Sequence, residues 1–345
     1  MKELTDRDSL TPILFGAAAF QYMNSACELG LFDLLNQKLS GLTKKDIAST
    51  IKLEQRAIDV LLLGTTALKL TKKANELYFN CHAITQLFKD NMWETFKDIV
   101  AFEQYIVYKG QFDFTESLKT NSNAGLHNIP GTGRDLYYRL SENPNLEKIF
   151  YKYMNSWTRM SNPLLFKFIN FNNFSKVLDV GGGAGVNAID IASKFNNVKI
   201  TILEIPGTAL IAEKNIKEAG LSDRVSILSS NMFEDNFPRD YDCLLFSHQL
   251  GIWTEEENIF ILKKAYQALP EQGKVIIFSS ISNDNGDGPL MAALDSVYFA
   301  AIPSEGGMVY SWNHHEDWLK KAGFTNIKRY KDSSWTPHGI IEATK

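Results

Sequence analysis

The stretch VLDVGGGAGVNAIDIASKFNNVKITILE, from Val177 to Glu204, decides the fold. Its first residues form the continuous apolar run that is typical of a buried parallel strand. Four glycines then crowd one turn, where the missing Cβ permits a positive φ and close approach to a ligand. A helix with one apolar face follows, and an alternating strand ends at Glu204. We expect a strand–turn–helix–strand unit, which binds ligands at the carboxyl ends of its strands, and an acid there can hold both hydroxyls of a ribose.

The spacing of the glycines narrows the choice of nucleotide. A dinucleotide fingerprint reads G-x-G-x-x-G, whereas this chain has D-V-G-G-G-A-G from Asp179 to Gly185. The pattern resembles the loop with which class I methyltransferases bind S-adenosylmethionine (SAM). The alternatives at this point are a turn that binds NAD and a tight turn without a ligand.

Length and composition set the broad class. The chain has 345 residues, which is long for a single core, so two domains are expected. Its net charge of −4 does not suggest a nucleic-acid partner. Three cysteines without paired spacing indicate neither a disulfide framework nor a zinc knuckle. The apolar run 12–23 is too short to cross a bilayer, and no cleavable signal pattern precedes it. We therefore expect a cytoplasmic protein with no membrane partner.

The first ninety residues follow the order helix, helix, helix, hairpin. We expect one apolar helix over 11–36, a short helix capped by Thr43, a third helix over 55–70 and a hairpin around Asn75. This winged-helix order is often used to bind DNA. However, the third helix carries no basic row for phosphates. A helix as apolar as the first one often packs on a second copy, so we expect a homodimerisation module.

The middle of the chain is rich in aromatic residues and is expected to shape a pocket. The segment 121–133 has the composition of an irregular loop. A helix over 144–167 follows, and we expect its face 153–158 to lie over the glycine turn. Aromatic surfaces favour planar ligands. Met154 and Trp157 on this face are therefore candidate substrate contacts.

Strands and helices alternate after Glu204, which predicts a doubly wound parallel sheet. A helix that begins near His314 is expected to end at Gly323. The expected strands are 225–228, 241–246, 274–279, 327–330 and 339–344, and the last two are expected to close the sheet in antiparallel fashion. The expected helices are 207–219, 255–269 and 314–322.

At this point the chain resembles the plant-type and bacterial small-molecule O-methyltransferases over nearly its whole length. Besides the glycine turn, the matching segments are LEIP (203–206), SNMFED (230–235), WTEEEN (253–258), ILKKAYQALPEQGKVII (261–277) and KKAGF (320–324). The resemblance implies an α/β protein in which a mostly α winged-helix dimerisation domain precedes a Rossmann-like SAM-dependent methyltransferase domain. The implied boundaries are 1–105 for dimerisation, 106–165 for linking helices that contribute to the substrate pocket, and 166–345 for the catalytic domain.

The resemblance also implies a cofactor site for SAM. In this assignment the glycine turn holds the methionine part of SAM, Glu204 holds the ribose, and Asn231 and Met232 flank the adenine. The full set of implied cofactor residues is Asp179, Gly181, Gly183, Glu204, Asn231, Met232, Ser247, Trp253 and Thr158. Trp312 is added to Met154 and Trp157 as a candidate substrate contact.

The chain departs from the family where the general base should stand. O-methylating members carry H-D-W, whereas this chain has Gly251-Ile252-Trp253. Neither Gly251 nor Ile252 can accept a proton. The supporting glutamate of the family's GGKERT-like segment is replaced by Val309.

Three histidines are candidates for the missing base. His248 follows the fourth strand of the expected sheet and titrates near neutral pH. Its alternative role is that of a buried histidine bonded to the backbone. His314 and His315 open the late helix, and their alternative role is a solvated helix start. His248 with His314 or His315 would suit iron or zinc, but no carboxylate matches, so we expect no metal. A substrate that is already nucleophilic needs no base, because alignment alone promotes methyl transfer.

Three functions compete on this sequence. The first is SAM-dependent methylation of a small aromatic or polycyclic metabolite, on oxygen by family default, with carbon or nitrogen favoured by Gly251. The second is a SAM-binding catalyst of the same fold that transfers no methyl group: a decarboxylase, hydroxylase or pericyclase. The third is a dimeric DNA-binding regulator, against which the neutral third helix argues.

Overall fold

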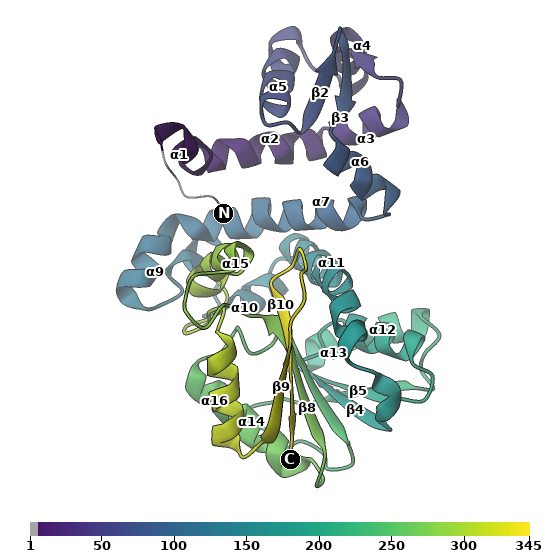
Figure 1. Ribbon diagram of the computed structural model, residues 1–345, viewed down its shortest axis with the longest axis vertical. Helices are drawn as coiled ribbons and strands as arrows, with labels where there is room; N and C mark the ends of the chain where they lie inside the picture. The colour runs from purple at the N-terminus through teal and green to yellow at the C-terminus, as the bar shows by residue number, and fades with distance from the viewer. Residues whose placement is uncertain (1–5) are drawn as a thin grey trace. The chain divides into compact units, whose positions relative to one another are not determined.

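The computed structural model describes residues 6–345 (Figure 1). The chain divides into two compact units, Met1–Tyr105 and Ile106–Lys345. Among the described residues, no helix combines the length and apolar character needed to cross a membrane.

The first unit begins with three helices rather than one. These are α1 (Arg7–Leu14), α2 (Gly16–Glu28) and α3 (Leu31–Gln37), so the single helix expected over 11–36 was wrong. The second break falls at Gly30, whose φ of 70° is left-handed and ends a helix at little cost. The break allows Leu31 and Phe32 to enter the core of this unit.

The rest of the first unit has the expected winged-helix order. Helix α4 (Lys44–Ile51) is capped by Thr43, whose hydroxyl accepts a hydrogen bond from the Asp46 N–H at 3.2 Å. The remaining elements are β1 (Leu42–Thr43), α5 (Gln55–Ala67), β2 (Thr71–Ala74), β3 (Leu77–Asn80), α6 (His82–Lys89) and α7 (Trp93–Phe102). Strands β2 and β3 form the expected hairpin, which turns at Asn75 with a φ of 54°.

Short helices and one long helix precede the sheet of the second unit. A π-helical turn, η1 (Glu103–Val107), spans the division between the units. The short helices are α8 (Tyr108–Gly110), η2 (Gln111–Asp113), α9 (Phe114–Thr120), η3 (Ala124–Asn128) and α10 (Leu136–Ser141). The long helix α11 (Pro144–Phe168) runs through the boundary expected at residue 165, and η4 (Phe171–Asn173) leads into the sheet.

The sheet of the second unit has seven strands in the order β6-β5-β4-β7-β8-β10-β9. Strands β6, β5, β4, β7 and β8 are parallel, and β10 and β9 add antiparallel pairs as expected. The strands are β4 (Lys176–Val180), β5 (Lys199–Glu204), β6 (Val225–Ser229), β7 (Cys243–Ser247), β8 (Lys274–Ser280), β9 (Thr325–Tyr330) and β10 (His338–Thr344). The connecting helices are α12 (Val186–Lys194), α13 (Pro206–Glu218), α14 (Glu255–Ala268), α15 (Leu290–Ala301) and α16 (Trp312–Ala322).

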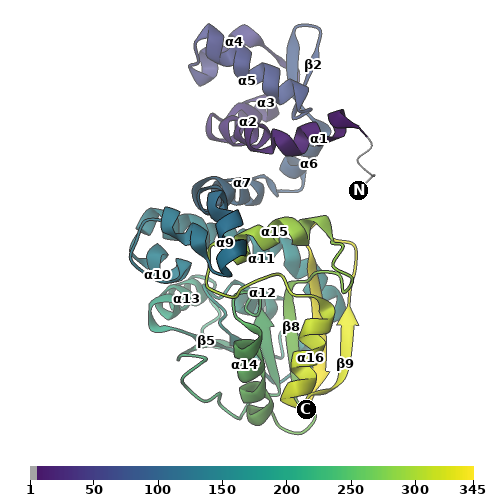
Figure 2. The same cartoon turned by 90° about the vertical axis from the view of Figure 1, so that its left-hand side faces the viewer.

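Helices cover both faces of this sheet (Figure 1). One face packs on α11, α12 and α13 through side chains such as Val177, Ile200 and Phe278. The other face packs on α14 and α16, and Figure 2 shows both helices alongside the strands. Because neighbouring residues of a strand point to opposite faces, each strand supplies both layers. The doubly wound fold places all five parallel strand ends at one edge.

Trp312 belongs to the core on the α14 and α16 side of the sheet, and its edge also lines an open surface hollow with Arg329 and Lys331. It is 6% exposed and packs in the α14 and α16 layer with Trp318. A Cβ on Gly339 would lie 2.3 Å from its ring. Trp157 lies on the opposite face, beside His338, as described below. The sheet therefore separates the rings of Trp312 and Trp157, and the expected substrate role of Trp312 stays a prediction.

Candidate active site

The glycine turn follows β4 and has the backbone that the sequence predicts. Gly181, Gly183 and Gly185 have φ values of 67°, 57° and 83°, which glycine adopts without strain. The Gly181 N–H donates to the Leu203 carbonyl at 2.8 Å, so the turn lies against the end of β5. Helix α12 begins directly after Gly185 and directs its N-terminus toward the edge where the strands end.

Glu204 at the end of β5 binds the same turn. One carboxylate oxygen accepts a hydrogen bond from the Gly183 N–H at 2.9 Å, and the other accepts from the Ile205 N–H at 2.9 Å. Burial raises the pKa of Glu204, and these two hydrogen bonds oppose the rise. The carboxylate is therefore held at the turn, where a ribose would need it.

Asp179 lies beneath the turn and is fully buried. Neither of its carboxyl oxygens has a hydrogen-bond partner in the described part of the chain. Burial, with the charge of Glu204 added, raises its pKa to about 7. A Cβ on Gly182 would lie 2.6 Å from Asp179 Oδ2, so the turn sits directly on this carboxyl group.

Two residues that the sequence did not single out lie beside the turn. Gln249 Nε2 donates to the Gly181 carbonyl at 2.7 Å and so holds the turn. Asn187, in the first turn of α12, donates from Nδ2 to Ser247 Oγ at 2.7 Å, and its buried Oδ1 has no partner within residues 6–345. Gln249 follows β7 and Asn187 follows the glycine turn. These positions in the sequence could have marked both as site residues.

The other cofactor candidates lie on three neighbouring segments. The Ser230 N–H donates to the Glu204 carbonyl at 2.9 Å, which brings Asn231 and Met232 beside β5. The ring of Trp253 packs edge-on against Phe233 at 4.8 Å, and its buried Nε1 has no partner among residues 6–345. Thr158 is buried on α11.

The position of the family's base is occupied by Gly251 and bordered by an aromatic ring. A Cβ on Gly251 would lie 3.3 Å from the ring of Phe299 on α15 and 3.5 Å from the Met308 carbonyl. Any side chain at this position would start in close contact with Phe299, whose ring would have to give by a few tenths of an ångström. Gly251 itself offers no proton acceptor.

A histidine pair lies a few residues away. His248 Nδ1 and His338 Nε2 are 3.1 Å apart, so one of these nitrogens donates a proton to the other. His248 has a φ of 58°, and its N–H donates to the Phe278 carbonyl at 2.8 Å. Burial lowers the pKa of His248 to about 4, and burial together with His248 lowers that of His338 well below its usual value.

The two remaining ring nitrogens, His248 Nε2 and His338 Nδ1, are buried without partners in the described structure. Two neutral imidazoles that share one hydrogen bond leave one N–H donor and one lone pair. If His248 Nδ1 donates to His338, His248 Nε2 is the free acceptor. The pair therefore offers a ligand one proton acceptor and one proton donor.

Trp157 lies against this pair. Its ring centroid is 5.5 Å from that of His338 and 5.8 Å from that of Tyr153, which stacks on it. Trp335 approaches its edge at 6.1 Å. Met154 is half-buried on the same helix. The site thus has an aromatic wall beside two unpartnered ring nitrogens.

His314 and His315 do not join His248. His314 is exposed, and its Nδ1 lies 2.8 Å from Ser311 Oγ in the cap of α16. His315 is buried against Trp318, and its Nδ1 lies 2.8 Å from the Ser311 carbonyl. Both belong to the α14 and α16 layer, across the sheet from His338. Their expected role as base is therefore not supported, because helix rotation turns both rings away from His248.

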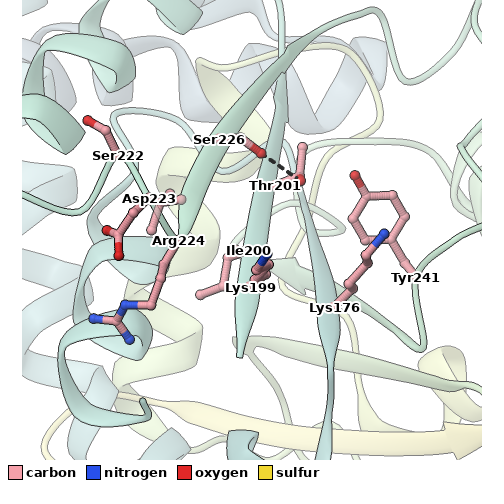
Figure 3. Close-up of a pocket in the computed structure, with 10 residues that line it drawn as sticks. Lys176, Lys199, Ile200, Thr201, Ser222, Asp223, Arg224, Ser226 and Tyr241 are labelled. Atoms are coloured by element: carbon pink, nitrogen blue, oxygen red, sulfur yellow. Dashed lines mark hydrogen bonds between the residues drawn. The ribbon is translucent and has the colours of Figure 1, made fainter. Parts of the chain in front are cut away.

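The described residues offer no metal site, and one hollow among them lies away from the strand ends. No group of three or more His, Cys, Asp or Glu side chains comes together as a metal site in residues 6–345. A hollow with a volume of about 260 Å³ lies where β4, β5 and β6 begin. Figure 3 shows its lining residues, among them Lys176, Lys199 and Arg224. The hollow lies at the edge of the sheet opposite to the glycine turn, away from the strand ends that bind ligands in such folds.

Comparison with known proteins defines the class. Residues 115–325 match the family model of the O-methyltransferase domain, and residues 12–88 match that of the O-methyltransferase dimerisation domain. The chain belongs to this family. It is a SAM-dependent methyltransferase, and the glycine turn with Glu204 fits that cofactor.

Individual relatives extend the comparison. The chain is 53% identical over 342 residues to the L-tyrosine C(3)-methyltransferase of Streptomyces lavendulae, covering 99% of this chain and 93% of that protein. The apo structure of the SAM-dependent methyltransferase SibL has a TM-score of 0.88 and 42% identity, covering 99% of each chain. Human N-acetylserotonin methyltransferase in complex with SAM shares the fold at 20% identity, with a TM-score of 0.85 over 100% of this chain and 99% of that one.

Glu204→Ala tests the cofactor site. We expect the affinity for S-adenosylhomocysteine to fall by roughly 10-fold to 100-fold, because the expected hydrogen bonds between the ribose hydroxyls and the Glu204 carboxylate are lost. Calorimetric titration measures this directly. Glu218→Ala, on the exposed end of α13, should bind like the parent chain. Unchanged affinity in Glu204→Ala would contradict the ribose assignment.

Asp179→Asn tests the carboxyl group beneath the turn. A raised pKa means that the folded chain keeps a proton that the unfolded chain has lost between about pH 4 and about pH 7. Stability should therefore fall as pH rises through this window, by up to about 1.4 kcal/mol per pH unit. Thermal unfolding across this range should show a flatter dependence in Asp179→Asn.

The matched control is Asp240→Asn, an exposed carboxylate paired with Lys176. It should keep the slope of the parent chain. An identical slope in Asp179→Asn would show that this carboxyl group is not the source of the pH dependence.

Proposed function

We propose that this enzyme transfers the SAM methyl group to a ring carbon of tyrosine, or of a close tyrosine derivative. This carbon is ortho to the phenol hydroxyl. The observation that carries the proposal is Gly251, which has no proton acceptor where the O-methylating members have their base and which packs closely beside the ring of Phe299. The 53% identity to an L-tyrosine C(3)-methyltransferase supports carbon as the acceptor. Of the alternatives left open by the sequence, carbon methylation accounts for both facts.

The reaction needs a nucleophilic ring carbon. Removing the proton of the phenol hydroxyl raises the electron density on the two ring carbons ortho to it. One of these carbons donates an electron pair to the methyl group, the bond from methyl to sulfur breaks, and S-adenosylhomocysteine leaves with the electrons. The ring carbon then loses its proton and aromaticity returns. Alignment of the carbon with the methyl–sulfur bond supplies much of the rate.

His248 is the proposed base for the phenol. Its lowered pKa keeps it neutral at physiological pH, so Nε2 can accept a proton when Nδ1 donates to His338. In this role His338 is a positioning residue that selects the tautomer. Trp157 and Tyr153 would hold the aromatic ring of the substrate.

We also infer an oligomeric state and a compartment for the enzyme. The match to a dimerisation domain supports a homodimer. Exposed apolar residues such as Ile13, Leu14 and Phe15 are the surface that a second copy would cover. The three free cysteines suit a reducing compartment such as the cytoplasm.

Labelled tyrosine distinguishes carbon methylation from oxygen methylation. With tyrosine deuterated at both ring carbons beside the phenol, carbon methylation replaces one deuterium and oxygen methylation keeps both. We expect a singly deuterated product that retains a free phenol, measured by mass spectrometry and NMR. A doubly deuterated methyl ether would establish the family's default reaction and contradict our proposal.

His248→Asn tests the base. We expect turnover to fall by roughly two to four orders of magnitude while the affinity for S-adenosylhomocysteine stays unchanged. Steady-state kinetics with tyrosine and calorimetry separate the two effects. His127→Asn, an exposed histidine bonded to the Ala124 carbonyl, is the control. Turnover retained in His248→Asn would remove this residue from the mechanism.

A further inference from the structure

Asp295 is an acidic residue on the inward side of α15. It lies three residues from Ala292 and from Tyr298, which are both buried. Residues at this spacing share one face of a helix. Phe299, four residues further on, is the ring that covers Gly251. Asp295 is partly buried and therefore lies on the inward face of α15, whereas Leu294, beside it in sequence, is 60% exposed.

The hydrogen bond of Asp295 places it near the histidine pair. Its carboxylate accepts from the hydroxyl of Ser280, the last residue of β8. Ser280 is the direct antiparallel partner of His338. Side chains of directly paired residues lie side by side on one face of a sheet. Asp295 thus approaches the same face as His338, whose buried Nδ1 has no partner in residues 6–345.

The surroundings of Asp295 are aromatic hydroxyls and not cations. Tyr298 is hydrogen-bonded to Tyr137 and lies within electrostatic range of Tyr153 and Asp295. No Lys, Arg or His of residues 6–345 forms an ion pair with Asp295. Burial raises its pKa to about 6. Asp295 is partly shielded from water, and a carboxylate in such a place without a counter-charge gains from a ligand that supplies one.

We propose that Asp295 binds the ammonium group of an amino-acid substrate whose phenol lies at His248 and His338. This inference rests on the proposed function, because it assumes a tyrosine-like acceptor. The ammonium group of the substrate then supplies the positive charge that residues 6–345 do not place at Asp295. It also explains how one site recognises both ends of the molecule: an acid at the amino end and the histidine pair at the phenol.

The test compares two ligands on enzyme loaded with S-adenosylhomocysteine. Tyrosine carries the ammonium group, and 3-(4-hydroxyphenyl)propionate has the same phenol and carboxylate without it. Calorimetry measures the affinity of the parent chain and of Asp295→Asn for each ligand. Since this readout is binding, it does not depend on which atom is methylated.

We expect the parent chain to bind tyrosine at least about tenfold more tightly than the propionate. Asp295→Asn should lose roughly 30-fold or more in tyrosine affinity, as happens when one partner of a buried charge pair is removed. Its affinity for the propionate should stay within about threefold. Leu294→Asn, which introduces the same residue on the exposed face of α15, should bind both ligands like the parent.

Two results would overturn the inference. One is equal affinity of the parent chain for both ligands. The other is an equal loss for both ligands in Asp295→Asn with unchanged binding of S-adenosylhomocysteine, which would assign Asp295 to the shape of the pocket. In either case, tyrosine methylated on its ring in the isotope experiment would leave the proposed function standing.

Discussion

The hydrogen bond from the Gly183 N–H to the Glu204 carboxylate is the contact around which the second unit is built. It requires a turn whose glycines adopt positive φ, and it requires β5 to end beside β4. The parallel order of the strands then brings the segments after β6 and β7 to the same edge. The cofactor site is thus a consequence of the sheet, and Asp179 beneath the turn adds a buried carboxyl group whose ionisation the fold disfavours.

The catalytic chemistry depends on a second constraint, which is the space beside Gly251. Phe299 borders it closely, and Gly251 supplies no proton acceptor there. A histidine pair drawn from the end of β7 and the start of β10 stands nearby instead. His248 and His338 are ninety residues apart in sequence, and only the antiparallel insertion of β10 beside β8 brings them together. This arrangement suits a phenol whose ring carbon, and not its oxygen, receives the methyl group.

The fold and the cofactor could be predicted from the sequence because both depend on patterns within short segments. The glycine spacing, the acid that ends β5 and the alternation of strands and helices each lie within one short segment. Sequence reasoning could not foresee that Trp312, His314 and His315 lie across the sheet from His338, because the rotation of α16 decides which of its faces meets the sheet. It missed His338, whose role depends on a partner strand distant in sequence. The position of His338 at the start of a strand beside β8 was the available signal.

The most direct measurement is a crystal structure of the enzyme with S-adenosylhomocysteine and tyrosine bound together. Our account predicts that a ring carbon beside the phenol lies nearest to the sulfur, with the phenol oxygen at His248 Nε2 and the ammonium group at Asp295. A phenol oxygen in line with the sulfur, and remote from the histidine pair, would contradict it.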